Sequence, residues 1–461
     1  MSFADPWPAP HASGPVNATL TVPASKSLTN RYLILAALAE GPSLLRSPLH
    51  SRDSALMIAA LRALGAVVEE LPGEGDFGPD LRITPLPVGR HLADPVAIDC
   101  GLAGTVMRFV PPLAALIDGQ VTFDGDPHAR SRPMSPVIAG LAALGVPVAA
   151  ADGAGGRPGS LPFTVTGTGA LDGGYVQVDA AGSSQFVSAL LLVGARFRLG
   201  IHLEHVGKPV PSPDHIAMTI AVLRELGVLV DDSVPNHWIV SPGPIRAFDV
   251  RIEQDLSNAG PFLAAALVTG GQVRIPHWPQ GTSQVGDLWR TILPAMGAEM
   301  TLDGDSLVVR GGERILGGEF ADTSELAPTV AALCALAQGP SRLSGIAHLR
   351  GHETDRLAAL VTEINALGGS VRETADGLVI EPAPLHGGTF HTYADHRMAT
   401  AGAILGLAVP GILVENIATT GKTMPEFPLL WQAMLAGSGP ETAQDVAAAP
   451  LTASHLEQSA S

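Results

Sequence analysis

The sequence predicts an α/β protein of two domains, each built from three copies of one repeated α/β unit. The first reason is length, because a chain of 461 residues is longer than one hydrophobic core usually organises. The second is a helical run that ends in glycine and is followed by a β-rich run, which recurs along the chain. The third is that three such units fall on each side of residues 248–253.

The glycines that end these helical runs lie at nearly constant spacing. Five of them follow a leucine or a methionine and are separated by 80, 82, 70 and 71 residues: Gly65, Gly145, Gly227, Gly297 and Gly368. A weaker sixth, Gly437, follows 69 residues after the fifth. Glycine is the usual residue at a left-handed helix stop. The spacing therefore predicts a repeated unit of about 75 residues.

The sixth unit has no β-rich run after its glycine, because residues 438–461 form an Ala/Ser/Gln tail that is typical of disorder. We therefore expect the early β-like run 18–22 to close this last unit and to place the N-terminus in the C-terminal domain. The expected domains are residues 24–251, and residues 14–23 together with 252–435, with 436–461 as a disordered tail. Two chain crossings, near Val22 and Arg251, predict a hinged clamp that closes on a ligand. A rigid repeat protein without a cleft is the alternative.

Composition limits the classes of partner. A formal net charge of −17 argues against nucleic acid or an anionic membrane as the main partner. Two cysteines make no disulfide framework, and residues 1–20 contain no secretory signal, so a reducing cytoplasm is expected. The longest apolar runs are too short to span a bilayer. An anionic ligand would need a local positive site in this acidic protein.

Lysine is rare here: the chain has only Lys26, Lys208 and Lys422, against 24 arginines. Lys26 lies among small and hydroxyl residues just before an apolar helical run, residues 32–39. Such a segment presents N–H groups, hydroxyls and one compact charge to a phosphate at a helix N-terminus. An ordinary N-cap, Ser27 or Thr29, beside a solvated lysine explains this segment equally well.

Eight further polar segments also precede apolar helical runs. They lie at residues 99–108, 125–133, 181–186, 208–215, 322–328, 348–357, 393–398 and 419–425, and the last of them carries Lys422. Each alone has an ordinary explanation as a tight turn, a solvated loop or a helix cap. Together with the Lys26 segment they supply cations at recurrent helix starts: Lys26, Arg31, Arg108, Arg132, Arg356, Arg397 and Lys422. This pattern predicts a site for more than one anionic group, with Glu325 and Glu353 nearby. No nucleotide P-loop, dinucleotide fingerprint or zinc motif is present.

These segments resemble the 5-enolpyruvylshikimate-3-phosphate (EPSP) synthase family, in the family's order and over residues 14–435. The resemblance rests on Ser25-Lys26-Ser27 with Asn30-Arg31, Ala103-Gly104-Thr105 with Met107-Arg108, Arg132-Pro133, Ser183-Ser184-Gln185-Phe186, Lys208-Pro209, Glu353-Thr354-Asp355-Arg356-Leu357, Asp395-His396-Arg397-Met398 and Lys422-Thr423. It implies two inside-out domains, each of three βαβαββ units. It also implies transfer of the enolpyruvyl group of phosphoenolpyruvate to the 5-hydroxyl of shikimate 3-phosphate, by a monomer with no metal or organic cofactor.

The resemblance also assigns site residues. It implies shikimate 3-phosphate contacts at Lys26, Ser27, Arg31, Ser183, Ser184, Gln185, Ser212, Glu325 and His352. It implies phosphoenolpyruvate contacts at Lys26, Gly104, Arg132, Gln185, Arg356, Arg397 and Lys422. Glu325 is expected to take the proton of the attacking hydroxyl. Glu353 is expected to protonate the methylene carbon, assisted by Lys26 and His396. A carboxyl that donates a proton near neutrality needs a raised pKa, which burial on domain closure is expected to supply.

Several positions depart from the common family pattern. Ala24 stands for a glycine, Leu102 for an asparagine, Glu325 for an aspartate and His352 for a lysine. Glu325 keeps its carboxylate, whereas His352 carries less positive charge than lysine at pH 7. Gly104 is the residue expected of glyphosate-sensitive members, although Phe109 stands where proline is common.

Two other functions compete with this one. The sibling enolpyruvyl transferase that acts on a UDP-sugar commonly uses a cysteine in the loop that corresponds to residues 125–132, and this loop has none. A non-catalytic homologue that binds phosphorylated ligands would have to keep Lys26, Glu325, Glu353 and Lys422 without using them.

Overall fold

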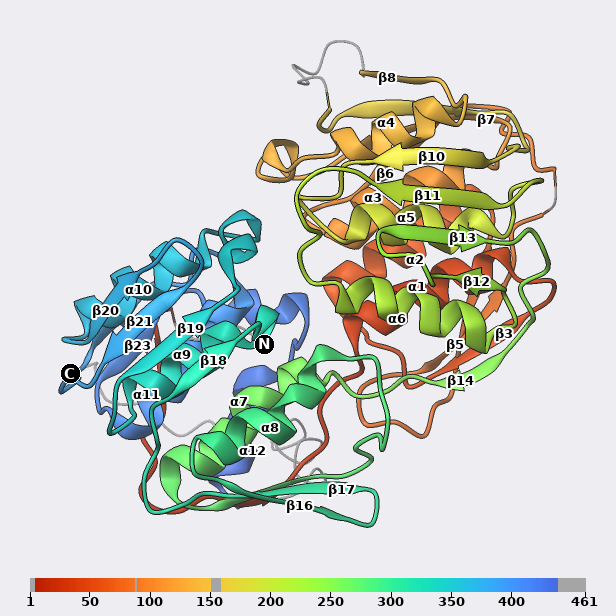
Figure 1. Ribbon diagram of the computed structural model, residues 1–461. Helices are drawn as coiled ribbons and strands as arrows, with labels where there is room; N and C mark the ends of the chain where they lie inside the picture. Colours follow the sequence, from red (N-terminus) through yellow and green to blue (C-terminus); the bar gives the residue numbers. More distant parts are fainter. Residues whose placement is uncertain (1–4, 88, 151–158, 438–461) are drawn as a thin grey trace, which may run out of the picture.

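The computed structural model describes residues 5–87, 89–150 and 159–437. Figure 1 shows two lobes, each with helices surrounded by sheets. One hydrophobic core runs from Ala24 to Ile252, and a second combines residues 7–22 with residues 256–434. The predicted fold class, two α/β lobes of three repeats each, is confirmed. We propose that the two cores mark the domains 24–251 and 14–23 plus 252–435.

The N-terminal lobe holds three four-stranded sheets, each with its helices packed on the inner side. The elements of the first unit are α1 (Lys26–Leu38), β3 (Ser43–Arg46), α2 (Arg52–Leu64), β4 (Val67–Leu71), β5 (Asp80–Thr84) and β14 (Asp249–Arg251). Those of the second are β6 (Val96–Asp99), α3 (Gly104–Ala114), β7 (Gly119–Asp124), η1 (Ala129–Ser131), α4 (Ser135–Ala143), β8 (Val148–Ala150) and β9 (Phe163–Gly167). Those of the third are β10 (Gly174–Val178), α5 (Gln185–Gly194), β11 (Ile201–His205), α6 (Asp214–Glu225), β12 (Val230–Asp231) and β13 (His237–Val240).

The C-terminal lobe repeats this plan with two four-stranded sheets and one of three strands. Its first unit contains β2 (Asn17–Thr19), α7 (Leu256–Thr269), β15 (Gln272–Ile275), η2 (Val285–Leu288), α8 (Trp289–Ala295), β16 (Glu299–Asp303) and β17 (Ser306–Arg310). The second contains β18 (Glu319–Ala321), η3 (Ser324–Leu326), α9 (Ala327–Ala335), β19 (Ser341–Ser344), η4 (Ala347–Gly351), α10 (Arg356–Ala366), β20 (Ser370–Glu373) and β21 (Leu378–Glu381). The third contains β22 (Gly388–Phe390), α11 (His396–Ala408), β23 (Ile412–Val414), η5 (Ile417–Lys422), α12 (Phe427–Leu435) and β1 (Trp7–Pro8).

The first helix of each unit lies in the centre of its lobe. Every residue of α5 from Phe186 to Gly194 is buried, and α3, α7, α9 and α11 are buried along nearly their whole lengths. A helix that is apolar on all sides has no face to present to water, so it is surrounded by other elements. The sheets enclose these helices and keep one outer face, as the alternating burial along β11 shows.

The predicted helix stops are confirmed at all six glycines. Their φ angles are positive: 109° at Gly65, 85° at Gly145, 87° at Gly227, 100° at Gly297, 91° at Gly368 and 72° at Gly437. The Gly65 N–H donates to the carbonyl oxygen of Leu61 at 3.0 Å, which closes the last turn of α2. Because side chains rarely adopt this conformation, the first five positions fix where a unit turns from helix to strand, and Gly437 follows the end of α12.

The expectation for the N-terminal strand needs correction. Strand β2 runs parallel to β15, in the first unit of the C-terminal lobe, and does not close the last unit. The last unit receives β1 instead, antiparallel to β23. In the same way β14 pairs in parallel with β3, in the first unit of the N-terminal lobe. In each lobe, the first unit takes its parallel edge strand from a segment next to a chain crossing. This strand is β14 in the N-terminal lobe and β2 in the C-terminal lobe.

The two crossings run side by side and are hydrogen-bonded to each other. Ser25 N–H donates to Glu253 O at 2.8 Å, and Asp255 N–H donates to Pro23 O at 2.9 Å, around an antiparallel bridge between Ala24 and Gln254. The hinge is therefore a two-stranded connection. In the described ranges, no helix is long and apolar enough to cross a membrane.

Candidate active site

A cavity lies between the lobes and is lined from both. Three of its lining residues, Lys26, Gly104 and Gln185, begin α1, α3 and α5 of the N-terminal lobe. In the other lobe, Asp255 caps α7, Glu325 precedes α9, and His396 begins α11. The first helices of all six units thus point their N-terminal ends at the cavity. Unpaired N–H groups and the positive ends of the helix dipoles favour anions there.

Lys26 enters the cavity from the first turn of α1. The N-cap of this helix is Ser25, whose Oγ accepts from Leu28 N–H at 3.4 Å; neither Ser27 nor Thr29 has that role. Lys26 Nζ lies 3.7 Å from Asp53 Oδ2, and Asp53 is buried. Burial lowers the pKa of Lys26, although Asp53 opposes this shift. The cap turns Lys26 toward the ligand space.

Two arginines of the N-terminal lobe are held in place around Gly104. Arg108 Nη1 donates to Gln185 Oε1 at 2.6 Å, and its guanidinium lies 5.1 Å from the centre of the Phe186 ring. Arg132 Nη1 donates to the carbonyl oxygen of Leu102 at 3.0 Å. Leu102, which stands where the family commonly has asparagine, thus orients Arg132 through its backbone carbonyl.

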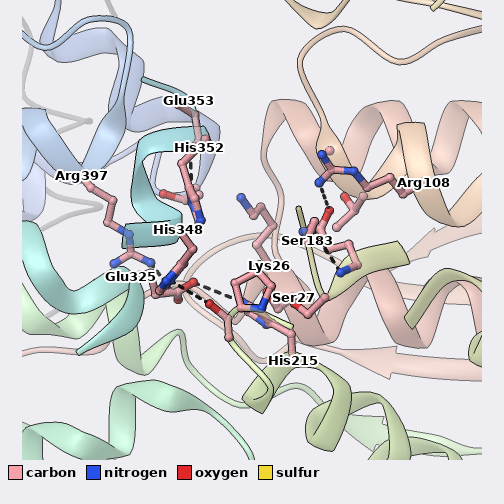
Figure 2. A pocket seen from close by; sticks show the side chains of 18 of the residues that line it. Lys26, Ser27, Arg108, Ser183, His215, Glu325, His348, His352, Glu353 and Arg397 are labelled. Carbon is pink, nitrogen blue, oxygen red and sulfur yellow. Dashed lines mark hydrogen bonds and ion pairs between the residues drawn. The ribbon is translucent and has the colours of Figure 1, made fainter. Parts of the chain in front are cut away.

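Glu325 receives partners from three elements. Its Oε1 accepts from Ser257 Oγ at 2.7 Å and from Arg397 Nη2 at 3.1 Å, and its Oε2 lies 3.4 Å from His215 Nε2. Burial alone would raise the pKa of Glu325, but Arg397, His215 and Ser257 hold it well below its usual value. Figure 2 shows Arg397, Glu325 and His215 together, with Arg108 and Ser183 on the other side of the space. Glu325 is ionised and can accept a proton.

Glu353 forms two ion pairs within the C-terminal lobe. Arg356 Nη2 donates to Glu353 Oε2 at 2.9 Å, and Lys422 Nζ donates to Oε1. Burial would raise the pKa of this carboxyl, but Lys422 and Arg356 hold it well below its usual value. Burial alone therefore does not supply the raised pKa that the sequence predicts, because the two cations outweigh desolvation.

Arg356 is itself fixed by a buried carboxylate. Its Nε donates to Asp395 Oδ2 at 2.7 Å, and Asp395 also caps α11 by accepting from Arg397 N–H at 2.8 Å. Burial acts to lower the pKa of Arg356, but Asp395 and Glu353 raise it overall. One carboxylate thereby orients the Arg356 guanidinium and fixes the backbone from which Arg397 projects.

Three histidines complete the lining on this side. Burial, reinforced by Arg356, lowers the pKa of His348 and holds that of His352 well below its usual value. Burial and Arg397 do the same for His396. Arg356 Nη1 lies 3.3 Å from His352 Nδ1, which accepts this hydrogen bond as a neutral ring. His352 thus adds a polar group where a lysine would add a charge.

The cavity brings together fifteen of the predicted site residues. These are Lys26, Ser27, Gly104, Arg132, Ser183, Ser184, Gln185, Ser212, Glu325, His352, Glu353, Arg356, His396, Arg397 and Lys422. Arg31 is predicted as a contact but does not line the cavity. It is buried, and its guanidinium donates to Ser27 O, His215 O and Thr219 Oγ1 at 2.8–2.9 Å.

Sequence reasoning missed several lining residues: Asp53, Asp255, His215, His348 and Thr423. His215 and His348 lie in segments that the sequence singled out, so their position next to a helix start was a usable signal. Asp53 and Asp255 had no such signal, because isolated acidic residues at helix starts are common. In the described ranges, no group of three or more His, Cys, Asp or Glu residues could hold a metal ion.

The fold and the cavity define a two-domain enzyme that binds anionic substrates between its lobes. The model of the family "EPSP synthase (3-phosphoshikimate 1-carboxyvinyltransferase)" matches residues 10–430 of the chain. This protein belongs to the EPSP synthase family. It transfers the enolpyruvyl group of phosphoenolpyruvate to the 5-hydroxyl of shikimate 3-phosphate and releases phosphate, a step of aromatic amino acid biosynthesis.

Individual relatives agree with this membership. A 3-phosphoshikimate 1-carboxyvinyltransferase of Kocuria rhizophila is 62% identical over 439 residues, which are 94% of this chain and 98% of the relative. The structure of EPSP synthase from Acinetobacter baumannii matches with a TM-score of 0.74 at 25% identity, covering 94% of this chain and 98% of that one. The enolpyruvyl transferase NikO from Streptomyces tendae, with a TM-score of 0.69 at 18% identity over 92% and 96% of the chains, shares the fold.

Proposed function

We propose that the lining residues divide between the two substrates of this reaction. Shikimate 3-phosphate is held by Ser27, Ser183, Ser184, Ser212 and His352, with Lys26, Gln185 and Glu325 at its reacting end. Phosphoenolpyruvate is held by Gly104, Arg132, Arg356, Arg397 and Lys422, with Lys26 and Gln185 shared. The observation that supports this division is one cavity in which two carboxylates, Glu325 and Glu353, lie among cations of both lobes. Arg31 acts indirectly, through Ser27 O and His215 O.

Glu325 is the proposed base. It is ionised, and among the described residues its Oε2 has one partner, His215, so this oxygen has a lone pair for the proton of the 5-hydroxyl. When that hydroxyl attacks the enol carbon of phosphoenolpyruvate, the methylene carbon takes up a proton. Glu353 is the proposed donor, with Lys26 and His396 assisting.

Glu353 must gain a proton before it can donate one. Its partners Lys422 and Arg356 are also proposed ligands of phosphoenolpyruvate. A phosphate or carboxylate group that takes over these two cations leaves Glu353 buried and unpaired, next to new negative charge. Both changes raise the pKa of a carboxyl. Substrate binding thus turns an ion-paired carboxylate into an acid.

Phosphate release tests the reaction directly. Phosphoenolpyruvate is supplied with shikimate 3-phosphate, then without it, then with a UDP-sugar as acceptor, and each assay is repeated with glyphosate. We expect release only with shikimate 3-phosphate, and inhibition by glyphosate because Gly104 leaves the space beside Arg132 open. Release with the UDP-sugar alone would instead assign the sibling activity. Binding of both substrates without release would indicate a non-catalytic homologue.

The proposal also covers the cellular compartment and the oligomeric state of the enzyme. We place the enzyme in the cytoplasm, where its anionic substrates and its two buried thiols, Cys100 and Cys334, are compatible with a reducing environment. We propose that it works as a monomer, because the cavity is formed by the two lobes of one chain. Sedimentation at enzyme concentrations used in assays tests this state.

A further inference from the structure

His215 lies in the cavity, but nothing in the family's pattern assigns it a role in this chain. It belongs to the first turn of α6, after the Pro-rich segment 209–213, and its side chain is 16% exposed. Its backbone carbonyl accepts from Arg31 Nη2 at 2.9 Å and from Thr219 Oγ1 at 2.9 Å. These contacts fix the backbone of His215, so the direction of its ring is set by the N-terminal lobe.

The ring of His215 reaches across the interface between the lobes. Its Nε2 lies 3.4 Å from Oε2 of Glu325, which belongs to η3 of the C-terminal lobe. Figure 2 shows the two side chains close together. A second link, between Ser212 Oγ and both Ser324 Oγ and His348 Nε2 at 3.1 Å, lies close by along the chain. The contact of His215 with Glu325 therefore exists only when the lobes are together.

The two oxygens of Glu325 are not equivalent. Oε1 already accepts two hydrogen bonds, from Ser257 and from Arg397 of its own lobe. A carboxylate oxygen offers about two lone-pair directions, so Oε1 is full. Oε2 has His215 as its partner and keeps one direction free. The free direction is the one that can receive a substrate proton, and the position of His215 determines where it points.

We propose that His215 is a positioning residue for the reaction: it donates to Oε2 of Glu325 across the lobe interface and thereby aligns the base only in the closed enzyme. This inference rests on the proposed role of Glu325 as the base. If His215 has this role, Glu325 can take the proton of the substrate hydroxyl efficiently only after the two lobes have closed. In the open enzyme Glu325 keeps its two partners on Oε1 but loses the group that orients Oε2.

A donor to a carboxylate also favours its ionised form, and this gives a second readout. Other charged and titratable groups act on Glu325 from neighbouring elements: Lys26, Arg31, Asp255, His348, His352, Arg356 and Arg397. They stay in place when His215 is replaced. Without His215 the pKa of Glu325 rises, so the acid limb of the profile of kcat/KM against pH moves to higher pH.

The test compares His215→Leu, which removes the donor at similar volume, with His215→Gln, which keeps an N–H donor. For His215→Leu we expect kcat to fall about tenfold or more, with KM for both substrates within about threefold, and the acid limb to move to higher pH. For His215→Gln we expect partial recovery of both. The matched control is His91→Ala, which removes an exposed histidine 2.8 Å from Asp118 that does not line the cavity, and is expected to change neither.

The double variant separates this inference from the role of Glu325. If Glu325 is the base, Glu325→Gln removes most turnover, and adding His215→Leu lowers it no further. An unmoved acid limb in His215→Leu, with Glu325→Gln still inactive, would overturn the positioning role and leave the base intact. Normal turnover in Glu325→Gln would overturn the base assignment itself. If His215→Leu lowers kcat by the same factor in the Glu325→Gln background as in the wild-type enzyme, His215 acts independently of Glu325.

Discussion

At the scale of single residues, the cavity contains two of the three lysines, Lys26 and Lys422, while the third, Lys208, is exposed and outside the lining. The rarity of lysine therefore pointed to the site from sequence alone. Sequence could not supply the partners. Asp53 and His215 meet Lys26 and Glu325 only because distant segments fold against one another. The low pKa of Glu353 was equally invisible, because it depends on where Lys422 lies.

Replacement of Lys26 by arginine should inactivate the enzyme although it keeps the charge. The lysine ammonium fits beside buried Asp53, and a planar guanidinium needs more space and a different set of acceptors. We expect kcat/KM to fall at least about a hundredfold, with the fold retained by circular dichroism. The matched control is Lys208→Arg, for which near-normal kinetics are expected. Equal kinetics for both variants would refute the special role of Lys26.

A methyl group at Gly104 should weaken phosphoenolpyruvate binding. An added Cβ would lie 3.1 Å from Arg132 Nη2, so the Arg132 guanidinium must shift by a few tenths of an ångström, whereas its 3.4 Å distance from Arg108 Nη1 is an ordinary contact. For Gly104→Ala we expect KM for phosphoenolpyruvate to rise about tenfold and glyphosate inhibition to weaken, with a smaller change in KM for shikimate 3-phosphate. Gly281→Ala, where no described atom lies within 4 Å of the added Cβ, is the control. An unchanged KM would place phosphoenolpyruvate away from Arg132.

The ion pairs of Glu353 should make stability depend on pH. Its folded-state pKa is below its unfolded value, so its contribution is present above the unfolded pKa and is lost as pH falls through the folded one. Glu353→Gln should lower the free energy of unfolding at pH 7 by on the order of 3 kcal/mol, and by less at about pH 4. Urea unfolding measures both values. Glu373→Gln, which removes an exposed partner of Arg350, should cost at most about 1 kcal/mol at either pH.

At the scale of elements, the helix stops were predictable and the strand partners were not. A left-handed glycine acts locally, so its spacing alone located the six units. The cap of α1 is Ser25, two and four residues before the candidates Ser27 and Thr29, because all three are good caps and only the backbone path distinguishes them. The pairing of β2 was wrong because a three-residue strand has no sequence feature that specifies its neighbour.

The glycine at the end of α2 should tolerate alanine worse than the one at the end of α7. At Gly65, φ is 109° and an added Cβ would lie 2.2 Å from Arg90 Nη1, whereas at Gly270, φ is 66° and the nearest described atom is 3.9 Å away. For Gly270→Ala we expect a loss of about 1 kcal/mol from backbone strain alone. Gly65→Ala should lose about 1 to 2 kcal/mol more, because the Arg90 side chain must also move. Chemical denaturation measures the free energy of unfolding of both variants. Equal losses would mean that the Arg90 side chain moves away at no energetic cost.

At the scale of the whole molecule, a protein of net charge −17 concentrates cations and six positive helix ends in one interdomain cavity. Neither lobe alone forms this site. The two-lobe organisation followed from the repeat in the sequence, but the convergence of the helix ends followed only from the way three units pack around each lobe's centre. Net charge therefore says little about the ligand, because the local field in the cavity has the opposite sign.

Small divalent anions should stabilise the whole enzyme more than chloride does. Inorganic phosphate, which resembles part of both substrates, can bridge cations of the two lobes and binds the folded state only. We expect millimolar phosphate to raise the melting temperature by several degrees over chloride at equal ionic strength. Lys422→Gln should reduce this gain, whereas Lys208→Gln should not. An equal effect of chloride would show that general screening, rather than a site, is responsible.

The exchange of strands at the chain crossings also sets the order in which the chain can assemble. Strands β1 and β2 are synthesised before the N-terminal lobe, yet β2 pairs with β15, and Val16 N–H donates to Thr269 Oγ1, 253 residues later. The N-terminal lobe, by contrast, has all its strands once β14 has been made. During synthesis the segment with β1 and β2 must therefore stay unpaired while an entire lobe folds after it. A segment made before the N-terminal lobe thus pairs only after that lobe is complete.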